Sequence, residues 1–208
     1  MTIQLTDTPS QFDGYALAPE ARALLFTEAR TANTFTDEPV SDEQLRAIHE
    51  LTKWGPTSAN SQPMRVLYVR TPEARERLVA HMGDMNKEKT RTAPVVAIVA
   101  ADLDFHENLP RTFPHAPGMK DYFADPVARE KVARFNAALQ AGYYLLAIRA
   151  AGLAAGPMSG FDAAGVDQEF FPDGLWKSLV VVNIGKPGEN AWFGRNPRLE
   201  YDEVTRQV

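Results

Sequence analysis

The chain changes from a helical pattern to a strand-like pattern at residues 54–63, which read Trp54-Gly55-Pro56-Thr57-Ser58-Ala59-Asn60-Ser61-Gln62-Pro63. This segment combines two prolines and a glycine with hydroxyl and amide side chains, so it cannot form a hydrophobic core. Pro56 and Pro63 fix φ and lower the entropy lost when the loop becomes ordered. Composition alone favours a helix end followed by an ordinary turn. The polar groups of Thr57, Ser58 and Asn60 also suit a planar polar ligand.

The bulk composition narrows the class of protein. The 208 residues fit one domain, with 44% hydrophobic residues, a net charge of −5 and a sequence pI of about 5.4. The absence of a basic stretch disfavours nucleic-acid binding. The absence of cysteine excludes disulfides, thiolate catalysis and zinc–thiolate sites. No secretory signal pattern and no membrane-length apolar run is visible, so we expect a cytoplasmic protein.

Four segments show helical patterns. Residues 19–32 begin with Pro19, and residues 72–83 also begin with a proline, which favours the first helical position. Ser41 and Gln44 form a capping box that starts a helix running to about Trp54, with Leu45, Ile48, Leu51 and Thr52 on one face.

Residues 128–151 give the strongest helical pattern. Val132, Phe135, Leu139 and Tyr143 repeat at spacings of three and four, and from Ala137 onward the other faces are apolar too. A helix that is apolar nearly all round is buried. We therefore expect this helix either at the centre of the core or in a subunit interface.

The strand-like segments are residues 66–69, 94–100 and 178–184. The second is apolar at every position, which predicts a strand buried on both faces. Residues 156–161 are interpreted as a second loop of small residues, followed by a short helix that Asp162 caps and that ends near Phe170. The long polar segment 102–127 is expected to be functional or mobile, and a lid over a site is one interpretation.

Helices that lie between strands predict an α+β or α/β fold with a small central sheet. We expect a single domain over residues 1–208, with an N-terminal arm at 1–16 and a C-terminal extension at 186–208. The extension has little to bury, so we expect it to pack on another surface, such as that of a second subunit.

Several kinds of catalytic site are missing from the sequence. There is no serine-nucleophile motif, metal motif or phosphate loop. His106 and His115 lie near acidic residues in segment 102–127, but their spacing matches no ligand motif, which favours a solvated loop. The Gly152–Gly156 pair follows a helix rather than a strand, so it is not a dinucleotide fingerprint.

Polar and basic groups remain around the small-residue loops. Arg30 follows a helix and can bind a phosphate with two hydrogen bonds. Asn86 and Lys89 lie three residues apart and can face one ligand. Ser159 and Gly160 offer backbone amides with little steric cover. Taken singly, each is explained as a surface residue, but together they suggest one polar ligand.

Four motifs carry a resemblance to a known family. They are Ala-Arg-Thr-x-Asn-x-Phe at 29–35, Gly-Pro-Thr-Ser-Ala-Asn-Ser-Gln-Pro at 55–63, Asn86-x-x-Lys89, and Leu-x-x-Gly-Pro-Met-Ser-Gly-Phe-Asp at 153–162. With these motifs the sequence resembles the nitroreductase family of FMN flavoproteins, from about Leu24 to Arg198. The resemblance implies a three-layer α+β fold with a small central mixed sheet flanked by helices. It also implies a domain-crossed homodimer with two FMN sites at the subunit interface.

The resemblance assigns roles by position. The FMN phosphate would be held by Arg30, Thr31 and Arg198, with help from Arg195. The pyrimidine edge of the flavin would face Asn86 and Lys89, and the isoalloxazine would be lined by Pro157, Ser159 and Gly160. The FMN of the partner subunit would contact Pro56, Thr57, Ser58 and Asn60. Asn33 stands where many members carry a second basic residue, and Ser159 stands where some carry glutamate.

The activity implied is that of an FMN-dependent NAD(P)H oxidoreductase with ping-pong hydride transfer through flavin N5. The motif at 153–162, with Asn-Ile-Gly at 183–185, is similar to a subgroup of malonic semialdehyde reductases in pyrimidine degradation. Malonic semialdehyde is therefore the favoured acceptor, and a nitroaromatic or quinone is the alternative. A flavin-binding protein without turnover and an interaction domain without a cofactor are the other hypotheses. Segment 102–127 is where we expect substrate selectivity to reside.

Overall fold

A computed structural model describes residues 14–208 of the chain. Residues 14–18 form no helix or strand, and the rest of the expected arm at 1–16 lies outside the described residues.

A four-stranded sheet forms the centre of the molecule, in the order β1-β2-β4-β3. Its strands are β1 (Met64–Val69), β2 (Val95–Asp102), β3 (Ala154–Met158) and β4 (Trp176–Gly185). All three neighbouring pairs are antiparallel, so the prediction of a mixed sheet is wrong for this chain. Between β1 and β2, helices α3 (Pro72–His81) and α4 (Asp84–Thr92) form a helical hairpin, and the chain re-enters the sheet at the same end at which β1 left it. An antiparallel pair follows from such a connection.

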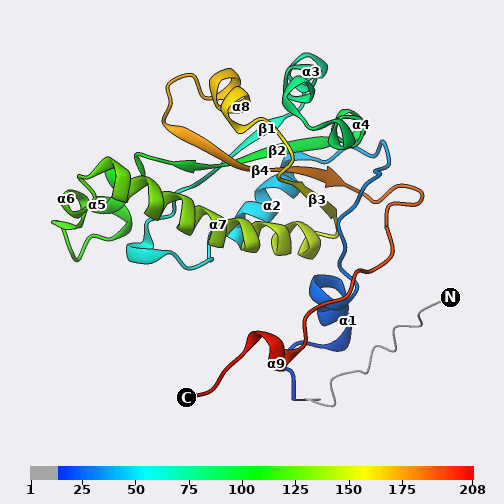
Figure 1. Ribbon diagram of the computed structural model, residues 1–208, viewed down its shortest axis with the longest axis horizontal. Helices are drawn as coiled ribbons and strands as arrows, with labels where there is room; N and C mark the ends of the chain where they lie inside the picture. The colour runs from blue at the N-terminus through cyan, green and yellow to red at the C-terminus, as the bar shows by residue number, and fades with distance from the viewer. Residues whose placement is uncertain (1–13) are drawn as a thin grey trace.

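Helices cover both faces of the sheet and give the expected three layers (Figure 1). On one face lie α2 (Asp42–Thr52) and α7 (Pro126–Ala150), and on the other lie α3, α4 and α8 (Ala163–Phe170). A separate apolar cluster fills each space between sheet and helices. All eight residues of β2 are buried, which confirms the prediction from its unbroken apolar sequence.

Helix α7 matches its prediction to within two residues at its start and one at its end. Asp125 accepts a hydrogen bond from the amide of Ala128, and Gly152 follows the helix at φ 74°. The buried face is small or polar apart from Tyr144 and Ile148. Phe135 is 66% exposed, and Leu139 and Tyr143, one and two turns further along the helix, are exposed too. The helix therefore packs on the core with one face and leaves an apolar face open.

Two predicted boundaries are wrong. The first helix consists of α1 (Pro19–Arg22) and the π-helical turn η1 (Ala23–Thr27), so it ends five residues before residue 32. It cannot continue because the chain then runs beside β3, where the amide of Ala32 donates to the carbonyl of Ala155 at 3.1 Å.

The segment 156–161 was expected to be a loop, but its first three residues belong to β3. Residues Ala154–Met158 pair with β4, and β3 is the edge strand of the sheet. An edge position accepts Pro157, which has no amide hydrogen to donate.

Segment 102–127 contains three short helices rather than an open loop. They are η3 (Phe105–Asn108), α5 (Leu109–Thr112) and α6 (Met119–Tyr122). Phe105, Leu109 and Phe123 join α7 in a third apolar cluster. His106 and His115 do not belong to a candidate metal site. Residues 14–208 contain no group of three or more His, Asp or Glu side chains placed to bind one metal ion. A lid function for this segment stays a prediction.

The capping box predicted for α2 is confirmed. Ser41 Oγ accepts from the amide of Gln44 at 3.2 Å, and Gln44 Oε1 accepts from the amide of Ser41 at 2.8 Å. Replacing Ser41 by alanine leaves one of these donors without its partner and should lower the free energy of unfolding by about 1 kcal/mol in urea. Ser41→Thr retains a capping hydroxyl and serves as the control; an equal loss in both variants would contradict the capping role.

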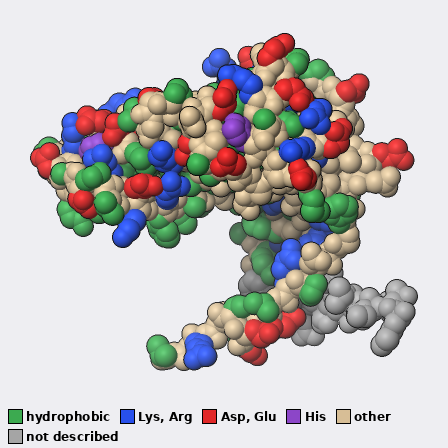
Figure 2. Space-filling model, turned by 45° about the horizontal axis from the view of Figure 1, so that its top comes forward, with side chains coloured by type: hydrophobic (Ala, Val, Ile, Leu, Met, Phe, Trp, Pro, Cys, Tyr) green, Lys and Arg blue, Asp and Glu red, His purple; other side chains and the backbone are tan. Residues whose placement is uncertain are grey.

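Both ends of the described chain leave the main body. Helix α1 and the segment that follows Gly185, which includes α9 (Tyr201–Val204), extend below the sheet and helices as an arm (Figure 1). In the space-filling view this arm stands clear of the body (Figure 2). Among residues 14–208 there is no helix with the length and apolarity needed to cross a membrane.

Candidate functional site

The first group of predicted site residues meets where α4, the end of β3 and the segment before residue 35 come together. Lys89 Nζ donates to Asn33 Oδ1 at 3.3 Å, and Asn86 Nδ2 donates to the carbonyl of Gly160 at 2.9 Å. The structure thus joins three of the four sequence motifs through direct hydrogen bonds. The spacing of Asn86 and Lys89 places both on the same side of α4, as expected.

The glycines at this junction are needed for close approach. The amide of Gly83, at the start of α4, donates to the carbonyl of Gly160 at 2.9 Å. A Cβ on Gly160 would lie 2.9 Å from Asn86 Nδ2, which is closer than real contacts allow. Ser159 and Gly160 are exposed, so this small-residue edge is open to a ligand.

The ammonium group of Lys89 is only partly exposed, and burial lowers its pKa. A lysine ammonium has three donors, and Asn33 accepts one, so two donors remain for an external acceptor. No carboxylate of the described chain forms an ion pair with Lys89. The group is therefore a positive charge at a half-buried position, suited to an electron-rich ligand.

The segment 30–33 lies along the outer edge of β3. Gly156 permits this contact, because a Cβ there would lie 2.6 Å from the carbonyl of Ala32. Arg30 Nη1 donates to the carbonyl of Phe193 at 3.4 Å, and Thr31 is exposed. Arg30 also lines a cavity of about 210 Å³, together with Arg149 and Trp192. Burial lowers the pKa of Arg149.

The two late arginines differ in their surroundings. Arg195 Nη2 donates to the carbonyl of Thr27, which places it beside η1. Arg198 donates to the carbonyls of Asn196 and Pro197 in its own segment. Within the described residues, no hydrogen bond joins Arg198 to Arg30 or Thr31, so the role of these residues as ligands of one phosphate stays a prediction.

The loop at 54–63 forms a second, separate group. Its amide at Ser58 donates to Asn136 Oδ1 at 2.7 Å, and Asn60 Nδ2 donates to the carbonyl of Thr112 at 2.8 Å. Thr57 Oγ1 accepts from the amide of Gln62 at 3.1 Å. Pro56, Ser58 and Asn60 are exposed. The loop lies near α5, at the opposite end of the molecule from α4 and the end of β3 (Figure 1).

This loop is built to hold an unusual backbone shape. Ala59, Asn60 and Gln62 all have positive φ values, between 44° and 51°. Such values cost energy for residues other than glycine and persist where surrounding contacts fix them. The buried Asn136 supplies one such contact from α7. The sequence analysis missed Asn136; the available signal was its polar side chain on an apolar face of the helix, which indicates a buried hydrogen-bond partner.

A cavity of about 820 Å³ is lined mainly by α2, β1 and α7, and Gln62 of the 54–63 loop and Trp176 also border it. None of the predicted site residues lines it. At its inner end Tyr144 Oη donates to Tyr68 Oη at 3.3 Å, and burial raises the pKa of both phenols. Cavity size therefore does not identify the chemical site in this chain; the clustering of the motifs does.

Comparison with known proteins identifies the family of this chain. The sequence profile of the nitroreductase family matches residues 27–186. A protein of Streptomyces griseus named "Putative NADH dehydrogenase/NAD(P)H nitroreductase" is 59% identical over 193 residues, covering 92% of this chain and 98% of the relative. A protein of the same name from Caulobacter sp. strain K31 is 50% identical over 184 residues, covering 88% of this chain and 94% of the relative.

Solved structures have the same fold at low identity. A "putative nitroreductase in complex with FMN" from Exiguobacterium sibiricum superposes with a TM-score of 0.80 at 19% identity, covering 92% of this chain and 98% of that chain. A "putative NAD(P)H:FMN oxidoreductase" from Staphylococcus epidermidis gives a TM-score of 0.80 at 19% identity, covering 92% and 97%. Identities this low establish the fold alone. The profile match and the close relatives establish that the chain belongs to the nitroreductase family.

Proposed function

We propose that the protein is an FMN-dependent NAD(P)H oxidoreductase. The observation that carries the proposal is the partly buried ammonium of Lys89, with two donors left over, on the same side of α4 as Asn86, whose amide binds the carbonyl of Gly160 at the open edge formed by Ser159 and Gly160. A positive charge next to a flat, sterically open edge suits a planar, electron-rich ring system. The names of the close relatives, which include NAD(P)H nitroreductase, support the same activity.

The residues present fit FMN chemically. The phosphate of FMN needs a forked cationic donor, and Arg30 provides one at a partly exposed position beside the hydroxyl of Thr31. Arg195 and Arg198 would add charge from the C-terminal segment. Asn86, Lys89 and Asn33 offer amide and ammonium groups for the pyrimidine edge. Pro157, Ser159 and Gly160 would border the ring with little side-chain bulk.

When bound, FMN supplies the atom, N5, that accepts a hydride from the nicotinamide and delivers it to the acceptor. The chain would contribute binding and electrostatics. Lys89 would hold positive charge at the edge where electron density gathers, and the small residues at 159–160 would leave room for nicotinamide and acceptor in turn. No side chain of the described site is arranged as an obligate acid or base, so we expect protons to come from water.

A complete site would need two subunits. The loop at 56–60 lies far from Lys89 within one chain, yet its exposed hydroxyls and amide would contact the FMN of a partner in a homodimer (Figure 1). Two apolar surfaces support such a dimer. One is the open face of α7, and the other is the projecting arm, where Phe26, Phe193 and Leu199 are exposed (Figure 2). Apolar surface of this extent is typical of an interaction site. We infer a domain-crossed homodimer, in which the projecting arm of each subunit packs against the surface of the other subunit.

The dimer proposal is tested by placing a charge on the open face of α7. Phe135→Asp should raise the dimer dissociation constant by about tenfold or more, because burying an aspartate without a partner costs more than 1.4 kcal/mol. Sedimentation at several protein concentrations measures the change. Leu175→Asp, at an exposed site directly before the start of β4, is the control. Equal sedimentation of Phe135→Asp and unmodified protein would contradict this interface.

The acceptor falls into one of two chemical classes. The motif at 153–162 resembles that of malonic semialdehyde reductases, which favours reduction of malonic semialdehyde to 3-hydroxypropionate. The names of the relatives, which include NAD(P)H nitroreductase, favour a nitro compound, and a quinone is grouped with it as the alternative. Steady-state values of kcat/KM for malonic semialdehyde, a nitroaromatic and a quinone, each with NADH and NADPH, separate the two classes. A semialdehyde value at least about tenfold above the others would support the first, and the reverse order would assign the second.

A further inference from the structure

Lys89 begins the last turn of α4, which ends at Thr92. The carbonyl groups of this turn have no glycine cap to provide their hydrogen bonds. The last four carbonyls of a helix lack intrahelical partners. Many helices solve this with a glycine in the left-handed region, but α4 ends at Ala93 in an extended conformation, with φ −66° and ψ 139°. The chain then passes directly into Pro94 and β2. Other groups must therefore bind these carbonyls.

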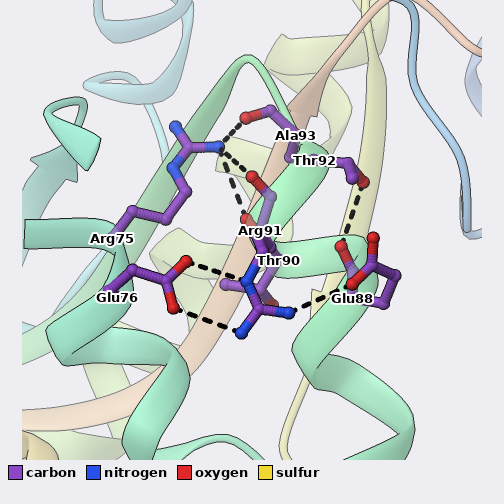
Figure 3. A network of polar contacts seen from close by, with 7 residues as sticks. All are labelled: Arg75, Glu76, Glu88, Thr90, Arg91, Thr92 and Ala93. Atoms are coloured by element: carbon purple, nitrogen blue, oxygen red, sulfur yellow. Dashed lines mark hydrogen bonds and ion pairs between the residues drawn. The ribbon is translucent and has the colours of Figure 1, made fainter. Parts of the chain in front are cut away.

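Arg75 supplies partners for two of these carbonyls and for two that follow the helix (Figure 3). From α3, its Nη1 donates to the carbonyls of Thr90 at 3.4 Å, Arg91 at 3.3 Å and Ala93. Its Nη2 donates to the carbonyl of Pro94 at 3.1 Å. Arg75 is 9% exposed, which is rare for an arginine, and burial lowers its pKa. A cation at the negative end of the helix dipole is favourably placed.

Asn183 binds another of these carbonyls, that of Lys89 itself. This residue is fully buried on β4, and its Nδ2 donates to the Lys89 carbonyl at 2.9 Å. Its Oδ1 accepts no hydrogen bond from any described residue. A buried amide that leaves one atom unpaired carries a cost in stability, so its presence directly after the apolar run 179–182 indicates a role beyond packing.

The ion pair between Arg91 of α4 and Glu76 of α3 holds the two helices together less strongly than the buried hydrogen bonds of Arg75 do. Arg91 binds both oxygens of Glu76, at 2.8 Å and 3.2 Å, and Glu88 at 3.0 Å, on the solvent side of the two helices (Figure 3). Exposed ion pairs of this kind contribute little to stability. The buried hydrogen bonds of Arg75 and Asn183 therefore fix where the last turn of α4 lies.

We propose that Arg75 and Asn183 are positioning residues that together hold the last turn of α4, Asn183 at the carbonyl of Lys89 and Arg75 at the carbonyls that follow it, so that the Lys89 ammonium group meets Asn33. One of them reaches the helix from α3 and the other from the sheet, so the turn is held from two sides. The functional meaning of this arrangement rests on the proposed FMN site, whereas the positioning of Lys89 itself does not.

The test measures how Lys89 reacts with an acylating reagent as the pH is varied. Full-length protein is treated with an N-hydroxysuccinimide ester without added FMN, and mass spectrometry follows Lys89 and Lys87. Lys87 is on the same helix and its side chain is 40% exposed, so it is an internal standard. In unmodified protein the Lys89 profile should have its midpoint below that of Lys87, because burial disfavours the ammonium form.

Two variants remove one support each. Arg75→Lys keeps a charge but cannot reach the same set of carbonyls, and Asn183→Leu keeps the approximate volume without the donor. In each, the Lys89 midpoint should rise by at least about half a pH unit, a threefold change in the dissociation constant. Arg77→Lys is the matched control, because Arg77 lies on α3 but binds Glu169 of α8. Thermal unfolding confirms that each protein is folded at the temperature used.

The outcomes are distinct. Midpoints that stay unchanged in both variants, or that shift equally in Arg77→Lys, would overturn the proposal. FMN titrations of the same proteins then connect it to function: Arg75→Lys and Asn183→Leu should weaken FMN binding by about tenfold, the effect of losing a hydrogen bond to a charged group. If unmodified protein binds no FMN while the acylation profiles shift as expected, the proposed function fails and the positioning role stands.

Discussion

Lys89→Ala should slow the bleaching of the flavin absorbance by NADH or NADPH by about 10²-fold, measured by anaerobic stopped-flow mixing. The ammonium is the only charged group of the described site within hydrogen-bond reach of Asn33, and it retains two donors for a ligand. Removing a preorganised donor from a partly desolvated position costs more than removing one in water, because few dipoles are available to replace it.

The matched control for this substitution is Lys87→Ala. Lys87 lies two residues away on α4 and pairs with Asp84 at 2.8 Å on the solvent side. Its removal should change the rate by less than about twofold, because its charge lies on the solvent side and is screened there. Equal rates in Lys89→Ala and unmodified protein, at saturating FMN, would show that Lys89 has no electrostatic role in the reaction.

Phe105→Ala should lower the free energy of unfolding by about 3–5 kcal/mol in urea. Phe105 is a fully buried residue of the segment 102–127. Its ring packs edge-on against that of Phe123, with 5.1 Å between the ring centroids. The substitution leaves a cavity among Leu109, Ala133 and other members of the third cluster. A loss of this size would show that the base of the segment is a fixed part of the core.

Tyr122→Ala provides the comparison for this result. Tyr122 lies on α6 in the same segment but is exposed, so its removal should change the unfolding free energy by less than about 0.5 kcal/mol. If Phe105→Ala were as mild as Tyr122→Ala, the segment would be loosely attached along its whole length and the packed cluster would be disproved.

The sequence predicted those elements whose pattern follows from burial. The unbroken apolar run of β2 and the periodic apolar residues of α7 allowed both to be placed almost to the residue. The capping box of α2 and the cap at Asp162 were likewise local signals, and both are present. Strand direction was not a local property, because it depends on the helical hairpin between β1 and β2, and the prediction of a mixed sheet failed there.

Helix α4 was missed as a separate element because Asp84–Thr92 has no apolar face to reveal its period. Its acidic first turn and basic last turn were the available signal, since they complement the helix dipole. Arg75 was overlooked for a related reason: it shares a helical face with Leu78 and Val79, both buried. An arginine at such a core position indicates a buried set of acceptors, but the sequence does not say which.

The family motifs predicted the candidate site better than the periodicity did. Asn33, Asn86, Lys89 and Gly160 come together through direct hydrogen bonds. Arg198 and the loop at 56–60 do not join them within one chain. Sequence motifs carry no information on which subunit supplies each residue, so the assignment of the loop to a partner remains a prediction for the dimer.

The most direct test of the account is the visible spectrum of the purified protein under anaerobic conditions, after FMN is supplied and before and after NADH or NADPH is added. The account predicts a protein-bound flavin spectrum that bleaches with the nicotinamide and returns when a suitable acceptor is added. A bound flavin that never bleaches would make the protein a flavin-binding protein without turnover. The absence of any bound flavin after reconstitution would contradict the account at its centre.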